Sequence, residues 1–261
     1  MDALTSSISQ DDPAATRLLM IVPTFNESAN IEEVIRKVCA SLPGVHVLVV
    51  DDHSPDGTAD MVEKMREMHP RLDLIRRDGE RGLGRAYSTG IHYALDHGFE
   101  IIGTMDADLS HDPAYLPSML ALLRKHDLVI GSRYVRDGGT VNWALRRILL
   151  SWLANKFAAT LLQIPAHDVT SGYRLYRRHT LEWIKNTEVK SSGYSFVGEL
   201  LYRAYRGGAR IAEHPIVFHD RTSGVSKLHR REIYLGALNL LRLRLGDGGR
   251  KSEVGPLTSD L

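Results

Sequence analysis

Two carboxylates with one residue between them follow an apolar stretch near the middle of the chain. Residues 101–105 are mostly apolar and predict a short buried strand, and Asp106 and Asp108 come directly after it. Side chains two positions apart on an extended chain point to the same side, so both carboxylates should project from the carboxyl end of this strand. A turn is the simpler explanation of an Asp-x-Asp pair, but the strand before it and the helix start at 112–113 favour a site. Such a pair suits a divalent cation, Mg²⁺ or Mn²⁺, with phosphate oxygens as further ligands.

Charged side chains also follow other predicted strands. Glu27, Asp52 and Arg133 each stand just beyond an apolar run, and in a parallel sheet these positions meet at one edge. Arg221 and Lys227 lie in a polar loop that contains Gly and Ser, where backbone can approach an anion closely. Because arginine holds a phosphate with a two-pronged fork and lysine acts as a point charge, we expect Arg133, Arg221 and Lys227 to form a phosphate clamp.

Strands and helices alternate along the first half of the chain. The hydrophobic pattern predicts strands at 17–23, 45–50, 72–75, 101–105 and 128–130, separated by helices at 29–42, 58–68, 85–97 and 113–125. This order indicates an α/β fold with a mostly parallel central sheet and helices on both faces. Downstream, the pattern predicts a loop at 168–176 that leads to a strand, a helix at 194–206, short strands at 210–212 and 216–218, and an amphipathic helix at 233–245.

Composition limits the class of protein. The chain has 261 residues with a formal net charge of +1, which gives no global field that would favour nucleic acid. Its single cysteine, Cys39, excludes an internal disulfide and fits a reducing compartment. No apolar run approaches the roughly 20 residues that cross a bilayer. We expect a flexible arm at 1–16, one domain at 17–245 and a disordered tail at 246–261.

The segment at 143–162 allows two interpretations. It is rich in Leu, Trp and Arg, and no acidic residue occurs between Asp137 and Asp168. A helix packed in the core is one interpretation, and a helix lying among lipid headgroups is the other, at about even odds. The second would make this a peripheral protein on the cytoplasmic face of a membrane, with or without an anchoring protein partner.

Seven motifs resemble one enzyme family over residues 18–245. They are PTFNE at 23–27, VDDHSPDGT at 50–58, GLG at 82–84, MDAD at 105–108, GSRY at 131–134, DVTSGYR at 168–174 and RTSGVSK at 221–227. The sequence resembles the family 2 glycosyltransferases, and within them the dolichol- or polyprenol-phosphate mannose synthases. The resemblance implies a GT-A fold, a divalent cation, and metal-assisted transfer of mannose from GDP-mannose to a polyprenyl monophosphate, with inversion.

The resemblance also implies roles for individual residues. The residues implied to bind the nucleotide sugar are Pro23, Phe25, Glu27, Val50, Asp52, Asp106, Ala107, Asp108, Ser110, Arg133, Arg221 and Lys227. Those implied to act in catalysis are Asp108, Arg133, Arg221 and Lys227. Those implied to bind the metal are Asp106, Asp108 and Ser110. Many relatives have Tyr at Phe25, so here ring stacking is retained without the hydroxyl. Many have Gln at Ser110, whose shorter side chain would reach a metal only through water, if at all.

The proposed chemistry is consistent with these residues. A lipid monophosphate is already anionic near neutral pH, so the nucleophile needs no catalytic base. The difficulty is to bring it to an anionic diphosphate, and a divalent cation with Arg and Lys offsets that repulsion. Two alternatives stay open at this point. The donor could be UDP-glucose or another nucleotide sugar, or the chain could be a non-catalytic nucleotide-binding subunit.

Overall fold

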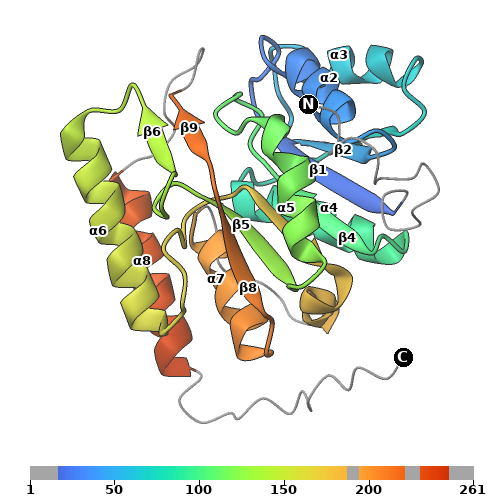
Figure 1. Cartoon of the computed structure of the whole chain (residues 1–261). Coiled ribbons are helices and arrows are strands. Elements are labelled where there is room, and N and C mark those ends of the chain that lie inside the picture. The colour runs from blue at the N-terminus through green and yellow to red at the C-terminus, as the bar shows by residue number, and fades with distance from the viewer. Residues whose placement is uncertain (1–16, 187–193, 221–229, 247–261) are drawn as a thin grey trace, which may run out of the picture.

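The computed structural model describes residues 17–186, 194–220 and 230–246 (Figure 1). The strands are β1 (Leu18–Thr24), β2 (His46–Asp51), β3 (Leu72–Arg76), β4 (Ile101–Thr104), β5 (Leu128–Ser132), β6 (Gly139–Val141), β7 (Arg174–Arg177), β8 (Ile211–Pro215) and β9 (Val217–His219). The helices are α2 (Ile31–Ser41), α3 (Thr58–Arg66), α4 (Leu83–Asp96), α5 (Leu116–Leu123), α6 (Leu145–Leu162), α7 (Tyr194–Arg206) and α8 (Arg230–Gly246). The predicted arm at 1–16 and tail at 246–261 lie almost wholly outside the described residues, as do Arg221 and Lys227.

Seven strands form the central sheet in the order β3-β2-β1-β4-β7-β5-β8. All neighbouring pairs are parallel except those of β7, which runs antiparallel to both β4 and β5. This confirms the predicted mostly parallel α/β sheet. The loop predicted at 168–176 is shorter in the structure, because β7 already begins at Arg174 and pairs with β4 and β5. The reversed direction of β7 brings its amino end to the edge where the parallel strands have their carboxyl ends.

Helices cover both faces of the sheet, as predicted. Alternate residues of β1 point to opposite sides, so that Met20 packs in one apolar cluster and Ile21 in the other. The cluster around Met20 contains residues of α2, α3 and α5, and the cluster around Ile21 contains residues of α4, α6, α7 and α8. Gly103 of β4 permits this packing, since a Cβ there would come within 2.5 Å of the Met20 side chain.

A second, two-stranded sheet lies beside the main one and was not predicted. The pattern indicated a short strand at 216–218, and β9 is found there, but it pairs in parallel with β6 instead of joining the central sheet. The three residues of β6 are too few to produce a periodic signal. β6 leads the chain from β5 out to α6, and β9 continues from β8 beside it (Figure 1).

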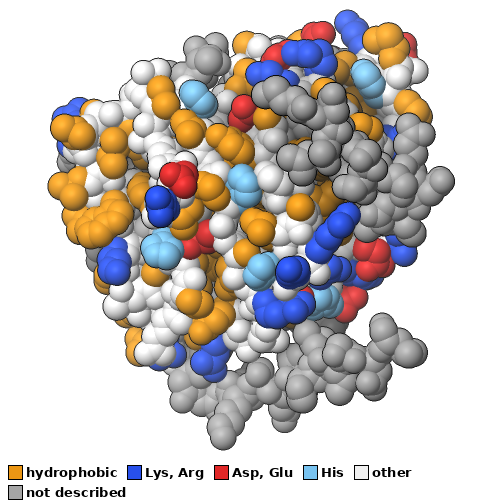
Figure 2. All heavy atoms as spheres, in the orientation of Figure 1, with side chains coloured by type: hydrophobic (Ala, Val, Ile, Leu, Met, Phe, Trp, Pro, Cys, Tyr) orange, Lys and Arg blue, Asp and Glu red, His pale blue; other side chains and the backbone are white. Residues whose placement is uncertain are grey.

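Helix α6 occupies the predicted segment and exposes most of its apolar side chains. Leu145 is 84% exposed, Leu150 67% and Phe157 53%, whereas the buried residues of this helix are Asn155, Ala158 and Leu162. Figure 2 shows hydrophobic side chains gathered over this side of the molecule. The interpretation of 143–162 as a helix packed within the core is therefore wrong. Within the described ranges, no helix is both long enough and apolar enough to cross a membrane.

Candidate active site

One edge of the central sheet collects the polar residues singled out by the sequence. Thr24 and Asp51 end β1 and β2 in register, and β4 runs parallel beside β1. The carboxyl ends of β1, β2, β4 and β5 thus meet the amino end of β7 along one rim. In open α/β sheets this rim is where ligands bind.

Asp106 stands just beyond β4 with its carboxylate partly exposed. The Tyr87 hydroxyl, from α4, donates to its Oδ1 at 3.2 Å. Gly172, in the loop before β7, faces the same two groups, since a Cβ there would lie 3.2 Å from the Tyr87 hydroxyl and 3.5 Å from Asp106 Oδ1. A side chain at 172 would therefore press on the Tyr87 hydroxyl that binds Asp106, and glycine leaves this hydroxyl in place.

Asp108 is the buried member of the pair, and Ser110 is tied to it. Leu109 between them has a left-handed backbone with φ of 61°, which turns the chain back on itself. The Ser110 amide donates to Asp108 Oδ1 at 3.1 Å, and the Ser110 hydroxyl donates to the same oxygen. Ala107 is buried and packs in the apolar cluster with Met20. Ser110 thus acts as a hydrogen-bond donor here, and its role as a metal ligand stays a prediction.

The oxygen atoms of this turn fit a hard divalent cation whose remaining ligands come from a substrate or water. Asp106 and Asp108 offer carboxylate oxygens from one turn, which Mg²⁺ and Mn²⁺ prefer. Across the part of the chain that the structure describes, no group of three or more His, Cys, Asp or Glu is placed to hold a metal ion. A cation at the Asp pair would therefore complete its coordination with oxygens from a substrate or water.

His111 is a residue of the site that the sequence did not reveal. It is only 2% exposed, and its Nδ1 accepts a hydrogen bond from the backbone amide of Asp106 at 3.1 Å. The ring stacks on Tyr173 with centroids 5.0 Å apart and meets Phe218 edge-on at 5.4 Å. Burial lowers the pKa of His111, which favours the neutral ring that this accepted bond requires. His111 therefore holds the turn that presents Asp106.

Asp52 lies just beyond β2 and is held by two partners from the loop between β3 and α4. It forms a close ion pair with Arg77, and its Oδ2 accepts the Gly82 amide at 2.8 Å. Phe25 lies beyond β1 with the Arg81 guanidinium 4.3 Å from the centre of its ring. Sequence reasoning identified Asp52 and Phe25 but missed Arg77 and Arg81, which lie in a charged loop that matches no phosphate-binding fingerprint.

The loop at 51–58 holds the backbone that follows β1. The Glu27 amide donates to Thr58 Oγ1 and the Ser28 amide to Asp56 Oδ2, both at 3.0 Å. Burial of Asp56 alone would raise the pKa of its carboxyl, but hydrogen bonds from Thr58 and Ser28 outweigh it and lower the pKa to about 2. Asp56 is thus a carboxylate fixed by hydrogen bonds within the loop. The backbone that it binds precedes α2, which begins at Ile31.

Pro23 and Val50 lie inside the sheet and not on its surface. They face each other in register on β1 and β2, and both are buried. Their side chains belong to the core, so any contact with a nucleotide would involve their backbone atoms. Glu27 is half-buried and its Oε2 accepts the Asn30 amide group at 2.9 Å.

Arg133 follows β5 and forms a buried ion pair with Asp168. Its Nε and Nη2 atoms lie 2.7 Å from the two carboxylate oxygens, and its backbone amide donates to Oδ2 at 3.0 Å. Burial of Asp168 alone would raise the pKa of its carboxyl, but Arg133 outweighs this and the pKa is lowered. The structure thus shows the Arg133 fork on a carboxylate, and its predicted contact with a substrate phosphate is untested.

A rim of this kind, with paired carboxylates beyond β4, belongs to the GT-A class of nucleotide-sugar transferases. The fold aligns with glucosyl-3-phosphoglycerate synthase from Mycobacterium tuberculosis, solved in complex with Mn²⁺, uridine diphosphate and glucosyl-3-phosphoglycerate, with a TM-score of 0.60. The alignment covers 89% of this chain and 82% of that chain at 18% identity.

Sequence comparisons identify the family. The profile of glycosyl transferase family 2 matches residues 20–184. The chain is 42% identical to polyprenol monophosphomannose synthase from Mycolicibacterium smegmatis, over 84% of each chain. It is 38% identical to undecaprenyl-phosphate mannosyltransferase from Micrococcus luteus, over 87% of this chain and 93% of that one. The chain belongs to glycosyl transferase family 2, and it is a glycosyltransferase.

The bond from the Asp106 amide to His111 can be tested with a shape-matched pair of variants. His111→Leu removes the acceptor and leaves a buried amide without a partner, which costs about 1–3 kcal/mol. We expect glycosyl transfer to fall by roughly tenfold or more. His111→Asn places an amide oxygen close to the position of Nδ1 and should recover most of that loss.

Both variants are compared by kcat/KM for the donor sugar nucleotide and by Tm. Equal activity of the two at equal Tm would contradict a role of His111 in positioning Asp106.

Proposed function

We propose that this enzyme transfers mannose from GDP-mannose to a polyprenyl monophosphate, with inversion at the sugar carbon. The observation that carries this proposal is the similarity, over most of both chains, to two proteins named for mannosyl transfer to polyprenol and undecaprenyl phosphate. The described rim supports it with the chemistry that such a transfer needs. An oxygen of the lipid phosphate attacks the sugar carbon, the bond from that carbon to the diphosphate breaks, and GDP leaves.

The Asp pair is proposed to hold a divalent cation against the diphosphate of the donor. When bound, the cation would supply positive charge to the leaving diphosphate. Asp106 has a partly exposed carboxylate, whereas Asp108 and Ser110 are buried and bonded to each other. Tyr87 and His111 hold Asp106 from two sides and thus orient it before the donor arrives.

Phe25, Glu27 and Asp52 are proposed to bind the nucleoside part of the donor. They lie beyond β1 and β2, on the opposite side of β4 from Arg133. The Phe25 ring already carries a guanidinium on one face and so presents an aromatic surface in a charged surrounding. In this proposal the nucleoside and the acceptor bind at opposite ends of the rim, with the Asp pair between them.

Arg133 is proposed to bind phosphate on the acceptor side, with Arg221 and Lys227 completing the clamp. Arg133 is only 9% exposed, so its charge acts in surroundings poor in water. Aromatic rings of Tyr134, Trp143 and Phe218 lie 5.2–5.6 Å from its guanidinium carbon. Arg221 and Lys227 lie outside the described residues, and their roles rest on the resemblance of the motif at 221–227.

Product formation tests the reaction itself. Purified protein with labelled GDP-mannose, polyprenyl phosphate and Mn²⁺ or Mg²⁺ should yield a lipid-extractable labelled product, and labelled UDP-glucose should not. Asp108→Ala and EDTA should each nearly abolish the product, because both remove the cation from the diphosphate.

Asp60→Ala is the matched control, since Asp60 forms only an exposed pair with Arg76 and should leave the rate unchanged. Product at the wild-type rate in EDTA would exclude the metal-assisted mechanism, and product from UDP-glucose alone would exclude mannose transfer.

The Arg133 clamp can be tested against a second arginine on the same pair of strands. Arg210 forms a two-pronged pair with Asp127 at the other end of β5 and β8, where its side chain is 65% exposed. Arg133→Lys keeps the charge but loses the fork, which the structure shows on Asp168 and which we propose also reaches the phosphate, so it should lower kcat/KM for polyprenyl phosphate by the equivalent of about 2–4 kcal/mol. Tm is measured for both variants, because loss of the buried pair with Asp168 would lower it.

Arg210→Lys makes the same change away from the rim and should stay near wild type. If Arg133→Lys were as active as Arg210→Lys, Arg133 would have no part in the acceptor site.

The exposed face of α6 is proposed to lie on the cytoplasmic surface of a membrane. Leu145, Leu149, Leu150 and Leu153 stand out from the helix, and its only charged side chains are Arg146, Arg147 and Lys156. Apolar side chains beside cations are typical of helices that lie among anionic headgroups. The single cysteine is the sequence support for the cytoplasmic side. A membrane-anchoring protein, if one takes part, would add to this contact.

Liposome flotation tests the α6 face. Leu150→Glu places a carboxylate at a site that is 67% exposed, and should release the protein from anionic liposomes. Met68→Glu makes an equivalent change at an apolar residue that is 75% exposed on the other side of the molecule, so it should not.

Salt should weaken retention of the wild type, since screening reduces attraction to anionic lipid. If the two variants floated equally well, a surface other than the α6 face would bind the liposomes.

A further inference from the structure

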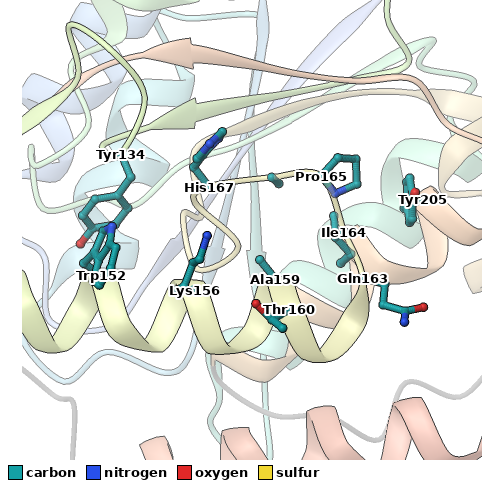
Figure 3. A pocket seen from close by; sticks show the side chains of 11 residues that line it. Tyr134, Trp152, Lys156, Ala159, Thr160, Gln163, Ile164, Pro165, His167 and Tyr205 are labelled. Atoms are coloured by element: carbon teal, nitrogen blue, oxygen red, sulfur yellow. The ribbon is translucent and has the colours of Figure 1, made fainter.

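A groove runs along α6 beside its exposed face, on the same stripe of the helix as Leu145 and Leu149. Gln163 ends α6 with a left-handed backbone, φ of 56°, so the chain reverses and residues 164–167 run back beside the helix. Figure 3 shows the space between these two segments, from Tyr134 and Trp152 at one end to Tyr205 at the other. Its volume is about 670 Å³, within the range of small-molecule sites.

The lining of the groove suits a long apolar chain that ends in an anion. Its walls include aromatic rings from Tyr134, Trp152 and Tyr205 and aliphatic groups from Ala159 and Ile164. Lys156 and His167 also line it, and none of its described lining residues is acidic. A cation above an apolar channel would complement a phosphate that carries a hydrocarbon tail.

One end of the groove lies at the predicted acceptor-phosphate site. Tyr134 follows Arg133 directly, and the Arg133 guanidinium carbon lies 5.2 Å from the centre of the Tyr134 ring. The Tyr134 hydroxyl is buried and has no hydrogen-bond partner among the described residues. A buried hydroxyl without a partner is unusual in a folded protein. The Tyr134 hydroxyl could donate a hydrogen bond to an oxygen of a ligand bound there.

The same end is continuous with the face of α6 that we assign to the membrane. Trp152 lines the groove and is also 46% exposed, so it belongs to both surfaces. A lipid drawn from the membrane beside Trp152 would thus enter the groove without crossing a polar barrier. We propose that this groove between α6 and residues 164–167 holds the isoprenoid chain of the acceptor, with its phosphate at Arg133.

This inference rests on the proposed function, and acceptor chain length separates the two. The acceptors are a two-isoprene phosphate, which would reach only the Tyr134 end, and a seven-isoprene phosphate, which would fill the groove. Assays in detergent micelles remove any need for membrane binding. Because burial of each methylene favours binding, wild-type kcat/KM should be at least about tenfold higher for the longer acceptor.

Two variants fill the groove. Ala159→Phe adds bulk to its wall, and Thr160→Phe does so at an exposed residue, where the fold is not disturbed. Ala121→Phe, at an exposed residue of α5, adds the same bulk outside the groove. We expect both groove variants to reduce the preference for the longer acceptor to within about twofold, with activity toward the shorter acceptor unchanged, and the control to keep the preference.

The proposal fails if both groove variants keep the wild-type preference, or if the wild type has none. It also fails if phosphatidylglycerol in the micelles competes as strongly as a polyprenyl phosphate, since the groove would then accept any lipid chain. Absence of transfer to either acceptor by the wild type would instead overturn the proposed function, and this inference with it.

Discussion

The buried ion pair between Arg133 and Asp168 joins the end of β5 to the loop before β7. Asp168 is fully buried, and such a carboxylate is tolerated only when a charge and hydrogen bonds compensate for lost water. Arg133 supplies the charge, and its backbone amide and guanidinium supply hydrogen bonds to the carboxylate. The backbone amide of Asp168 is bound separately, by Glu213 on β8 at 2.9 Å. Removing either partner of such a pair typically costs about 3–5 kcal/mol, because the other charge stays buried and unpaired. These contacts therefore hold three elements together: the end of β5, the loop that precedes β7, and strand β8.

The same loop connects this ion pair to the Asp pair and to α6. Asn155 of α6 accepts the Thr170 amide at 3.0 Å, and the Thr170 hydroxyl accepts from Arg133 at 2.9 Å. Two residues further on, the Gly172 carbonyl accepts from Thr104 at the end of β4. The carboxylates beyond β4, the arginine beyond β5 and the helix on the outer surface are thus spaced by one short stretch of backbone. A reaction between a membrane lipid and a soluble nucleotide sugar requires such a fixed spacing.

The two surfaces of α6 have different physical tasks. Its inner residues, Asn155 and Ala158 among them, are buried against the domain, and its outer leucines are left to solvent. An apolar face of this extent is unusual for a protein surrounded only by water, because water is a poor solvent for it. Contact with lipid would remove that cost, and the groove behind Trp152 would let one lipid leave the bilayer.

Sequence alone determined the strands and helices of the central sheet and the place of Asp106 and Asp108 beyond β4. These follow from local patterns, since the hydrophobic period and the change to polar residues depend only on residues that are close together in the sequence. The edge at which Asp52, Asp106 and Arg133 gather also follows, because parallel strands share one carboxyl end.

Tertiary structure alone decided which side chains became partners. Asp168 lies 35 residues from Arg133 and Arg77 lies 25 from Asp52, and no local period encodes such separations. The reversed insertion of β7 between β4 and β5, the turn of the His111 ring toward Asp106, and the outward face of α6 likewise depend on packing. An apolar helix has the same sequence pattern whether the core covers it or not, and only the folded chain shows that the outer leucines of α6 are left exposed.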